Sequence, residues 1–84
     1  MEQDSRDKLI VDIRKKTDYE KETYPGAVNI YWEEWYDHKE EIPKNKPVYL
    51  ICYTDIRATE IADRMQPEGY EVYAVENGIQ SYLR

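Results

Sequence analysis

Four short stretches of the chain are rich in β-branched and aromatic residues and are bounded by polar or turn-forming residues. They are too short for helices and predict strands at residues 9–13, 27–30, 48–52 and 71–75. The run at 48–52 is almost continuously apolar, which is typical of a parallel strand that is covered on both faces.

Between these stretches the apolar positions follow a helical period. A charged helix is predicted at residues 18–22, with Thr17 as its N-cap. A second helix is predicted at residues 32–40. Its spacing places four side chains on one face, namely Trp32, Trp35, Tyr36 and Lys39.

A third helix is predicted from about Ala58, and Pro67 and Gly69 end it. The apolar face of this helix consists of Ala58, Ile61, Ala62 and Met65. Asn77 and Gly78 then predict a turn after the last strand, before a short terminal helix at 79–83.

Strands that alternate with helices over short connections predict an α/β fold with a small parallel sheet of about four strands, flanked by helices. The length of 84 residues fits one domain, so we expect residues 1–84 to form a single unit. Residues 1–8 are charged and are expected to form a flexible N-terminus.

Composition narrows the classes of function. The net charge of −6 repels phosphate backbones, and no basic stripe relieves it, so nucleic-acid binding is not expected. No apolar run approaches the roughly 20 residues that span a bilayer, and no signal peptide is visible. A single cysteine excludes an internal disulfide and a Cys-x2-Cys metal site, and a reduced cytoplasm is the expected location.

That cysteine, Cys52, follows the apolar strand and precedes the third helix, with Arg57 five positions later. The residues between them are Tyr53, Thr54, Asp55 and Ile56. Such a loop can form a cradle of backbone N–H groups at the positive end of a helix, which favours a thiolate, a persulfide or a bound oxyanion. The alternative from spacing alone is an inert buried cysteine that ends a core strand.

Four further groups of residues accompany Cys52 along the chain. They are Val11-Asp12-Ile13-Arg14 with Asp18-Tyr19, Pro25-Gly26-Ala27-Val28-Asn29-Ile30, Gly69-Tyr70-Glu71-Val72-Tyr73 and Glu76-Asn77-Gly78-Ile79. Together with the segment from Cys52 to Arg57, their order and spacing resemble the single-domain rhodanese family from Leu9 to about Tyr82.

The resemblance implies a rhodanese-like fold in which Cys52 is the sulfur-carrying nucleophile. A donor such as thiosulfate would leave a persulfide on this cysteine, and the amides of the 53–57 loop would stabilise the persulfide and the departing anion. The sulfur would then pass to a thiophilic acceptor such as thioredoxin, cyanide or a sulfur-relay protein. Such a reaction requires no metal or organic cofactor.

The chain departs from the family pattern at several places. Asp55 stands where the family commonly has glycine, and Ala58 stands where a small hydroxyl residue often follows the arginine. Glu22 and Thr23 replace the usual Gly-His pair. The strand that usually precedes the segment beginning at Val11 is mostly or wholly missing, which predicts a minimal version of the fold.

Asp55 bears directly on the expected activity. As an N-cap it would accept hydrogen bonds from amides near Ala58. A carboxylate roughly 5 Å from the sulfur would instead oppose a thiolate by about 3 kcal/mol at an effective dielectric near 20. That is about two pKa units, and pairing of Asp55 with Arg57 would reduce the penalty. Both a slow and a brisk sulfurtransferase are consistent with this loop.

Other polar residues have two interpretations each. Asp12 and Arg14 end the first predicted strand, on the side where open α/β sheets bind ligands, but Arg14 can instead form an ion pair with Asp18. His38 is expected to be a solvent-exposed helical residue. Tyr53 can line the site of Cys52 or lie on the surface.

Two alternatives to a sulfurtransferase remain at this stage. The first is a non-catalytic interaction module with the same fold, in which Asp55 has spoiled the cradle. The second is a cysteine phosphatase or arsenate reductase of related architecture. Those enzymes use a loop one residue longer, Cys-x5-Arg, and Asp55 would repel a dianionic substrate.

Overall fold

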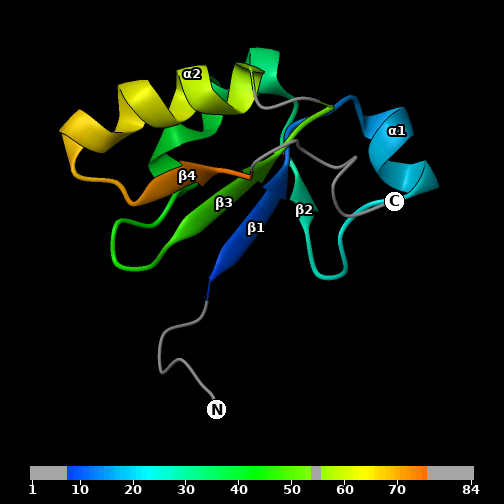
Figure 1. Ribbon diagram of the computed structural model, residues 1–84, viewed down its shortest axis with the longest axis horizontal. Helices are drawn as coiled ribbons and strands as arrows, with labels where there is room; N and C mark the ends of the chain where they lie inside the picture. Colours follow the sequence, from blue (N-terminus) through cyan, green and yellow to red (C-terminus); the bar gives the residue numbers. More distant parts are fainter. Residues whose placement is uncertain (1–7, 54–55, 76–84) are drawn as a thin grey trace.

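In the described part of the chain, four parallel strands form one sheet in the order β2-β1-β3-β4 (Figure 1). The strands are β1 (Leu9–Asp12), β2 (Val28–Asn29), β3 (Val48–Ile51) and β4 (Val72–Ala74). All three neighbouring pairs are parallel. The predicted small parallel sheet is confirmed, although each strand is shorter than the run that predicted it.

The structure is a computed structural model that describes residues 8–53 and 56–75. The predicted turn at Asn77-Gly78, the terminal helix at 79–83, and loop residues Thr54 and Asp55 lie outside the described residues, as does nearly all of the N-terminal segment 1–8.

Helices occupy the connections between the strands. The two α-helices are α1 (Lys16–Lys21) and α2 (Ile56–Met65), and the two 3-10 helices are η1 (Trp32–Glu41) and η2 (Gln66–Glu68). No helix within residues 8–53 and 56–75 is long and apolar enough to cross a bilayer.

Two details of the predicted helices are wrong. Thr17 lies inside α1 and does not cap it, because the N-cap position belongs to Lys15, which makes no side-chain capping bond. The helix after β2 is of the 3-10 type. At its two ends the backbone N–H groups donate to the carbonyl three residues earlier, as in a 3-10 helix. These bonds run from Glu34 N–H to the Tyr31 carbonyl and from Ile42 N–H to the Lys39 carbonyl.

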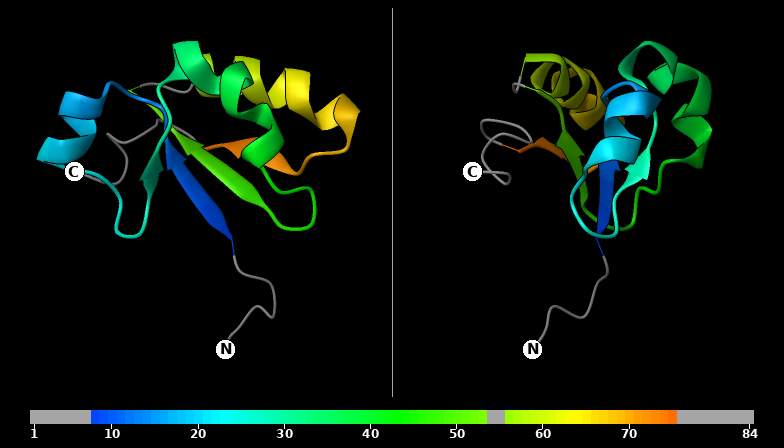
Figure 2. Two further views of the ribbon diagram at one scale, coloured as in Figure 1. Left: turned by 180° about the vertical axis from the view of Figure 1, so that it is seen from behind. Right: turned by 90° about the vertical axis from the view of Figure 1, so that its right-hand side faces the viewer.

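The hydrophobic core lies on one face of the sheet. Alternate strand residues point to this face, and the most deeply buried are Val11, Val48, Leu50 and Val72. They pack against Trp35 from η1 and against the apolar side of α2, formed by Ala58, Ile61, Ala62 and Met65. The predicted apolar face of this helix is confirmed. Figures 1 and 2 show η1 and α2 side by side over the same side of the sheet.

Hydrogen bonds continue beyond the ends of the strands and draw three segments together. Ile13 N–H donates to the Ile51 carbonyl at 2.8 Å, and Trp32 N–H donates to the Ile13 carbonyl at 3.0 Å. The residues that follow β1, β2 and β3 therefore meet at the carboxyl edge of the sheet, where open α/β sheets bind ligands.

Candidate functional site

Cys52 is the first residue after β3, at this carboxyl edge, and it is 6% exposed. The chain then passes through Tyr53, which is half exposed, and enters α2 at Ile56. The predicted order of strand, cysteine, loop and helix is confirmed for the described residues. The helix begins at Ile56, which is slightly earlier than expected, so that Arg57 lies in its first turn.

The thiol lines a cleft of about 390 Å³, which we call the Cys52 cleft. Its lining consists of Arg14, Lys15, Tyr31, Trp32, Cys52, Tyr53, Ile56 and Arg57. Residues from the ends of β1 and β3, from the start of η1 and from the first turn of α2 thus surround one space. Five of the predicted site residues are brought together here, while Asp12 lies behind Arg14.

Positive charge dominates the described lining of the Cys52 cleft. Arg14, Lys15 and Arg57 are cations, and no carboxylate is among the lining residues within the described ranges. This contrasts with the whole chain, whose net charge is −6. A local positive potential at the mouth of a buried thiol favours a thiolate and attracts an anion.

Arg14 is a buried cation with a fixed orientation. Its Nε and Nη2 donate to Asp12 Oδ1 at 3.0 Å and Oδ2 at 2.8 Å, so the carboxylate binds the guanidinium in a bidentate manner. The predicted ion pair between Arg14 and Asp18 is wrong, because Arg14 reaches only the backbone carbonyl of Asp18. A second carbonyl, of Glu22, also accepts from Nη2.

The charge of Arg14 acts on the thiol. Its hydrogen bonds with Asp12 raise the pKa of Arg14 above the ordinary value against the opposing effect of burial, and the negative charges of Asp12 and Asp18 add to the rise, as would a Cys52 thiolate. Coulomb interaction is mutual. A guanidinium that is stabilised by a Cys52 thiolate stabilises that thiolate to the same extent.

Asp12 is fully buried and is the centre of the hydrogen-bond network that holds Arg14. Besides the guanidinium, it accepts the backbone N–H of Arg14 at 3.0 Å and the hydroxyl of Thr23 at 2.7 Å. Thr23, which departs from the pattern of the family that the sequence resembles, therefore has a structural role that the sequence did not indicate.

Arg57 also lines the Cys52 cleft. Its guanidinium lies over the Trp32 ring, 4.1 Å from the centroid, and Nη1 donates to Glu60 Oε1 at 3.3 Å. Arg14 lies over the ring of Tyr53, 5.5 Å from its centroid. Each of the two arginines that line the cleft therefore lies against an aromatic face, an arrangement that is favourable when water is excluded.

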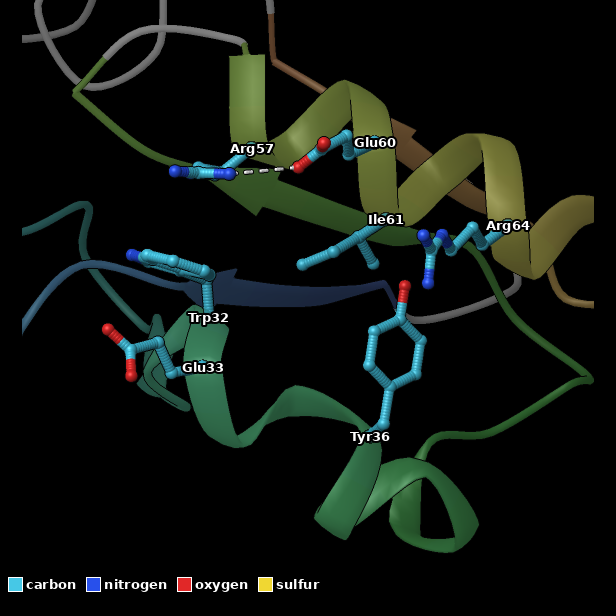
Figure 3. Close-up of a pocket in the computed structure, with 7 residues that line it drawn as sticks. All are labelled: Trp32, Glu33, Tyr36, Arg57, Glu60, Ile61 and Arg64. Carbon is cyan, nitrogen blue, oxygen red and sulfur yellow. Dashed lines mark hydrogen bonds and ion pairs between the residues drawn. The ribbon is translucent and has the colours of Figure 1, made fainter.

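A second groove adjoins the Cys52 cleft, between η1 and α2 (Figure 3). We call it the η1–α2 groove, and it is lined by Trp32, Glu33, Tyr36, Arg57, Glu60, Ile61 and Arg64. Figure 3 shows Arg57 above Trp32 at one end, Arg64 near Tyr36 at the other, and Ile61 between them. Because Trp32 and Arg57 line both spaces, this pair separates the groove from the cleft.

Three residues of the Cys52 cleft were missed at the level of sequence, namely Lys15, Tyr31 and Trp32. The sequence pattern places Trp32 on a helix face. Its position just after β2 also indicates that it lies near Cys52, because the carboxyl ends of parallel strands meet at the same edge of the sheet. His38, expected to be exposed, is half exposed on η1, where its ring contacts Glu41 at 3.0 Å, and it does not line the Cys52 cleft.

Comparison with known proteins gives consistent matches. The rhodanese-like domain family matches residues 1–84. Thiosulfate sulfurtransferase GlpE of Coxiella burnetii is 30% identical over 78 residues, which cover 92% of this chain and 73% of GlpE. A tRNA sulfurtransferase of Desulfurococcus amylolyticus is 26% identical over 76 residues, covering 90% of this chain and 15% of that protein.

Among solved structures, SSP1007 of Staphylococcus saprophyticus superposes with a TM-score of 0.84 at 24% identity. The superposition covers 94% of this chain and 79% of that one. At this level of identity the match concerns the fold.

Proposed function

The chain belongs to the rhodanese-like domain family, and we propose that it is a sulfurtransferase that carries sulfur as a persulfide on Cys52. Two of its relatives, GlpE and the tRNA sulfurtransferase, are named for sulfur transfer. The observation that supports the assignment to Cys52 is its position in a cleft whose described lining holds three cations and no carboxylate.

In the first half-reaction the Cys52 thiolate attacks the outer sulfur of a donor such as thiosulfate. A sulfur–sulfur bond forms on Cys52, the sulfur–sulfur bond of the donor breaks, and sulfite leaves with the bonding electron pair. Arg57 and Lys15 attract the anionic donor, and Arg14 stabilises the thiolate before attack and the persulfide after it. Asp12 is a positioning residue that acts through Arg14.

In the second half-reaction the thiolate of an acceptor attacks the outer sulfur of the persulfide, and the Cys52 thiolate is regenerated. A small thiol or a sulfur-relay protein is the proposed acceptor. The backbone amides of the 53–57 loop, including those of Thr54 and Asp55, are proposed to stabilise the persulfide. A reduced compartment such as the cytoplasm would keep Cys52 available as a thiolate.

The test is direct because Cys52 is the only thiol of the chain. After incubation with thiosulfate, intact mass spectrometry should show an increase by the mass of one sulfur atom. The Cys52→Ser variant, whose fold is checked by circular dichroism, should show no increase. A folded wild-type protein that forms no adduct with thiosulfate or with an organic donor would overturn the proposal and would favour a non-catalytic interaction module.

A further inference from the structure

The η1–α2 groove adjoins the Cys52 cleft, and the proposed persulfide chemistry leaves most of its residues without a role. Its volume is about 390 Å³, the same as that of the cleft. Trp32 and Arg57 line both spaces, so a molecule in the groove touches the border of the cleft. The groove is therefore placed to hold a partner whose reactive end reaches the thiol of Cys52.

Part of the groove is apolar. Ile61 lies between the Trp32 end and the Tyr36 end, as Figure 3 shows, and it is 4% exposed. Tyr36 is 44% exposed, although most of its ring is apolar. Interfaces between proteins are centred on such aromatic and aliphatic side chains, which become buried when the partner binds. A partner side chain over Ile61 would remove the exposed part of Tyr36 from water.

The charged residues that line the groove are balanced. Arg57 pairs with Glu60 at 3.3 Å, and Arg64 lies over the Tyr36 ring, 6.0 Å from its centroid. Glu33 is the other charged residue of the lining. The lining therefore holds two cations and two carboxylates, and by itself it selects no sign of charge.

The exposed side of η1 adds negative charge next to the groove. In a 3-10 helix the side chains three residues apart eclipse one another, so Glu34, Asp37 and Glu40 form a row beside the row that contains Tyr36. We call it the acidic row. All three residues are exposed, and none forms an ion pair within residues 8–53 and 56–75. Lys39 does not offset them, because it is paired with Glu68.

The groove and the cleft therefore attract opposite charges. Arg14, Lys15 and Arg57 line the Cys52 cleft and favour a thiolate that enters it. Asp55 lies outside the described residues and is not included in this comparison. The acidic row favours cations. A partner that fits both regions combines a thiolate with basic side chains a few residues away.

Building on the proposed function, we propose that the η1–α2 groove docks the protein that accepts sulfur, through a segment in which an apolar residue is flanked by lysine or arginine and followed by cysteine. The apolar side chain lies over Ile61 against Tyr36, and the basic side chains face the acidic row. The thiolate of the segment attacks the outer sulfur of the Cys52 persulfide. A sulfur–sulfur bond forms on the acceptor, the one on Cys52 breaks, and the Cys52 thiolate leaves with the electron pair.

The test measures the second half-reaction alone. The protein is first loaded with sulfur from thiosulfate, the excess is removed, and intact mass spectrometry follows the loss of sulfur from Cys52. The acceptors are three synthetic peptides, namely basic acetyl-KLKGC-amide, acidic acetyl-ELEGC-amide, and acetyl-KGKGC-amide, which lacks the apolar residue. Each rate constant is divided by that of the same peptide with 2-hydroxyethyl disulfide at the same pH, which removes differences in thiol reactivity.

The normalised rate of the basic peptide should exceed that of the acidic peptide by about tenfold at low salt. This ratio should approach one in about 1 M NaCl, where the screening length is about 3 Å. The basic peptide with leucine should also react about tenfold faster than the one with glycine, because leucine buries apolar surface in the groove.

Two variants locate the docking site. Asp37→Lys should lower the basic-to-acidic ratio about fivefold, and Glu20→Lys, the same change at an exposed position of α1, should leave it unchanged. Tyr36→Ser should lower the leucine-to-glycine ratio at least about threefold. Its matched control is Tyr73→Ser, because Tyr73 is 42% exposed and lies on β4, outside the groove lining. Circular dichroism checks the fold of each variant.

The outcomes separate the two proposals. Equal normalised rates for the three peptides overturn the docking of a basic segment and leave the persulfide carrier intact. Ratios that keep their wild-type values in folded Asp37→Lys and Tyr36→Ser overturn the assignment to this groove. A dimer in sedimentation that Tyr36→Ser converts to a monomer also overturns it, because a second copy then covers the groove. The absence of a persulfide on Cys52 before any peptide is added overturns the proposed function itself.

Discussion

The two arginines that line the Cys52 cleft carry the same charge but are held in different ways. Arg14 is 6% exposed and is bound by the bidentate Asp12 carboxylate and by two backbone carbonyls. The side chain of Arg57 is 46% exposed, stacks on Trp32 and makes one contact of 3.3 Å with Glu60. The first guanidinium is part of the folded core, whereas the second can leave its position at little cost.

This difference suggests a division of roles. A buried pair is expensive to break, because the remaining charge has no solvent to stabilise it. An exposed pair contributes about 0–1 kcal/mol and can be exchanged for a ligand. Arg14 therefore sets a permanent positive potential beside the thiol, and Arg57 is free to adjust to a donor or a leaving group. The following changes test that contrast.

The largest effect is expected at Asp12. Asp12→Asn keeps the shape of the side chain but leaves the Arg14 guanidinium buried beside a neutral amide, so the free energy of unfolding should fall by about 3–5 kcal/mol. Urea denaturation measures this loss. In the double variant Asp12→Asn/Arg14→Met the loss should be smaller than the sum of the two single losses. A loss below about 1 kcal/mol would mean that Arg14 is held no more firmly than Arg57.

Asp55 lies between Tyr53 and Ile56 in the sequence, outside the described residues, and its charge is expected to oppose the thiolate. At roughly 5 Å and an effective dielectric near 20 the opposition would be about 3 kcal/mol. Asp55→Gly should therefore raise the thiosulfate:cyanide sulfurtransferase rate, by up to about a hundredfold. Asp55→Asn removes the charge alone and should give most of the gain. An unchanged rate in both folded variants would show that the carboxylate is directed away from the sulfur.

Removal of the charge of Arg57 should affect the reaction more than the fold. In Arg57→Met the donor loses a charged hydrogen-bond partner worth about 1.5–3 kcal/mol, so kcat/KM should fall about 10- to 100-fold. The free energy of unfolding should change by less than about 1 kcal/mol. Arg57→Lys should recover part of kcat/KM, because lysine keeps the charge without the flat stacking surface. A large loss of stability with unchanged kcat/KM would assign Arg57 a structural role.

The smallest effect is expected at Glu60. Glu60→Gln weakens the ion pair between Arg57 and Glu60 on α2, and the KM for an anionic donor should decrease about two- to threefold because the guanidinium no longer faces this competing carboxylate. Glu20→Gln, which removes the partner of Lys16 on α1, is the control and should leave KM unchanged. An increase of KM in Glu60→Gln would mean that the pair aligns Arg57 for binding.

The strands and the position of Cys52 directly after a strand could be predicted from the sequence because their signals are local. Runs of β-branched residues mark strands wherever they lie, and Cys52 and Arg57 are close enough in sequence to share one loop. The type of the η1 helix could not be predicted. The spacing of Trp32, Trp35 and Tyr36 is compatible with both helical periods, and only the hydrogen bonds distinguish them.

The remaining parts of the site depend on contacts between distant segments. Trp32 reaches the Cys52 cleft because its N–H bonds to Ile13, a pairing set by the register of the sheet. The sequence also suggests an ion pair between Arg14 and Asp18 that would hold the following turn. However, Arg14 precedes α1 and its side chain turns back toward Asp12 at the end of β1. The choice of partner for Arg14 depends on which carboxylate is buried beside it, and the sequence does not reveal which one is buried.

The two tryptophans of the chain lie three residues apart on η1 in very different surroundings. Trp35 is fully buried in the core, and its indole N–H has no hydrogen-bond partner among the described residues, so its fluorescence should be emitted at short wavelength and should report unfolding. Trp32 lies under a guanidinium at the boundary between two cavities. Its emission should change whenever Arg57 moves or a ligand enters, so the unmodified protein carries one optical probe for folding and another for occupancy of the Cys52 cleft.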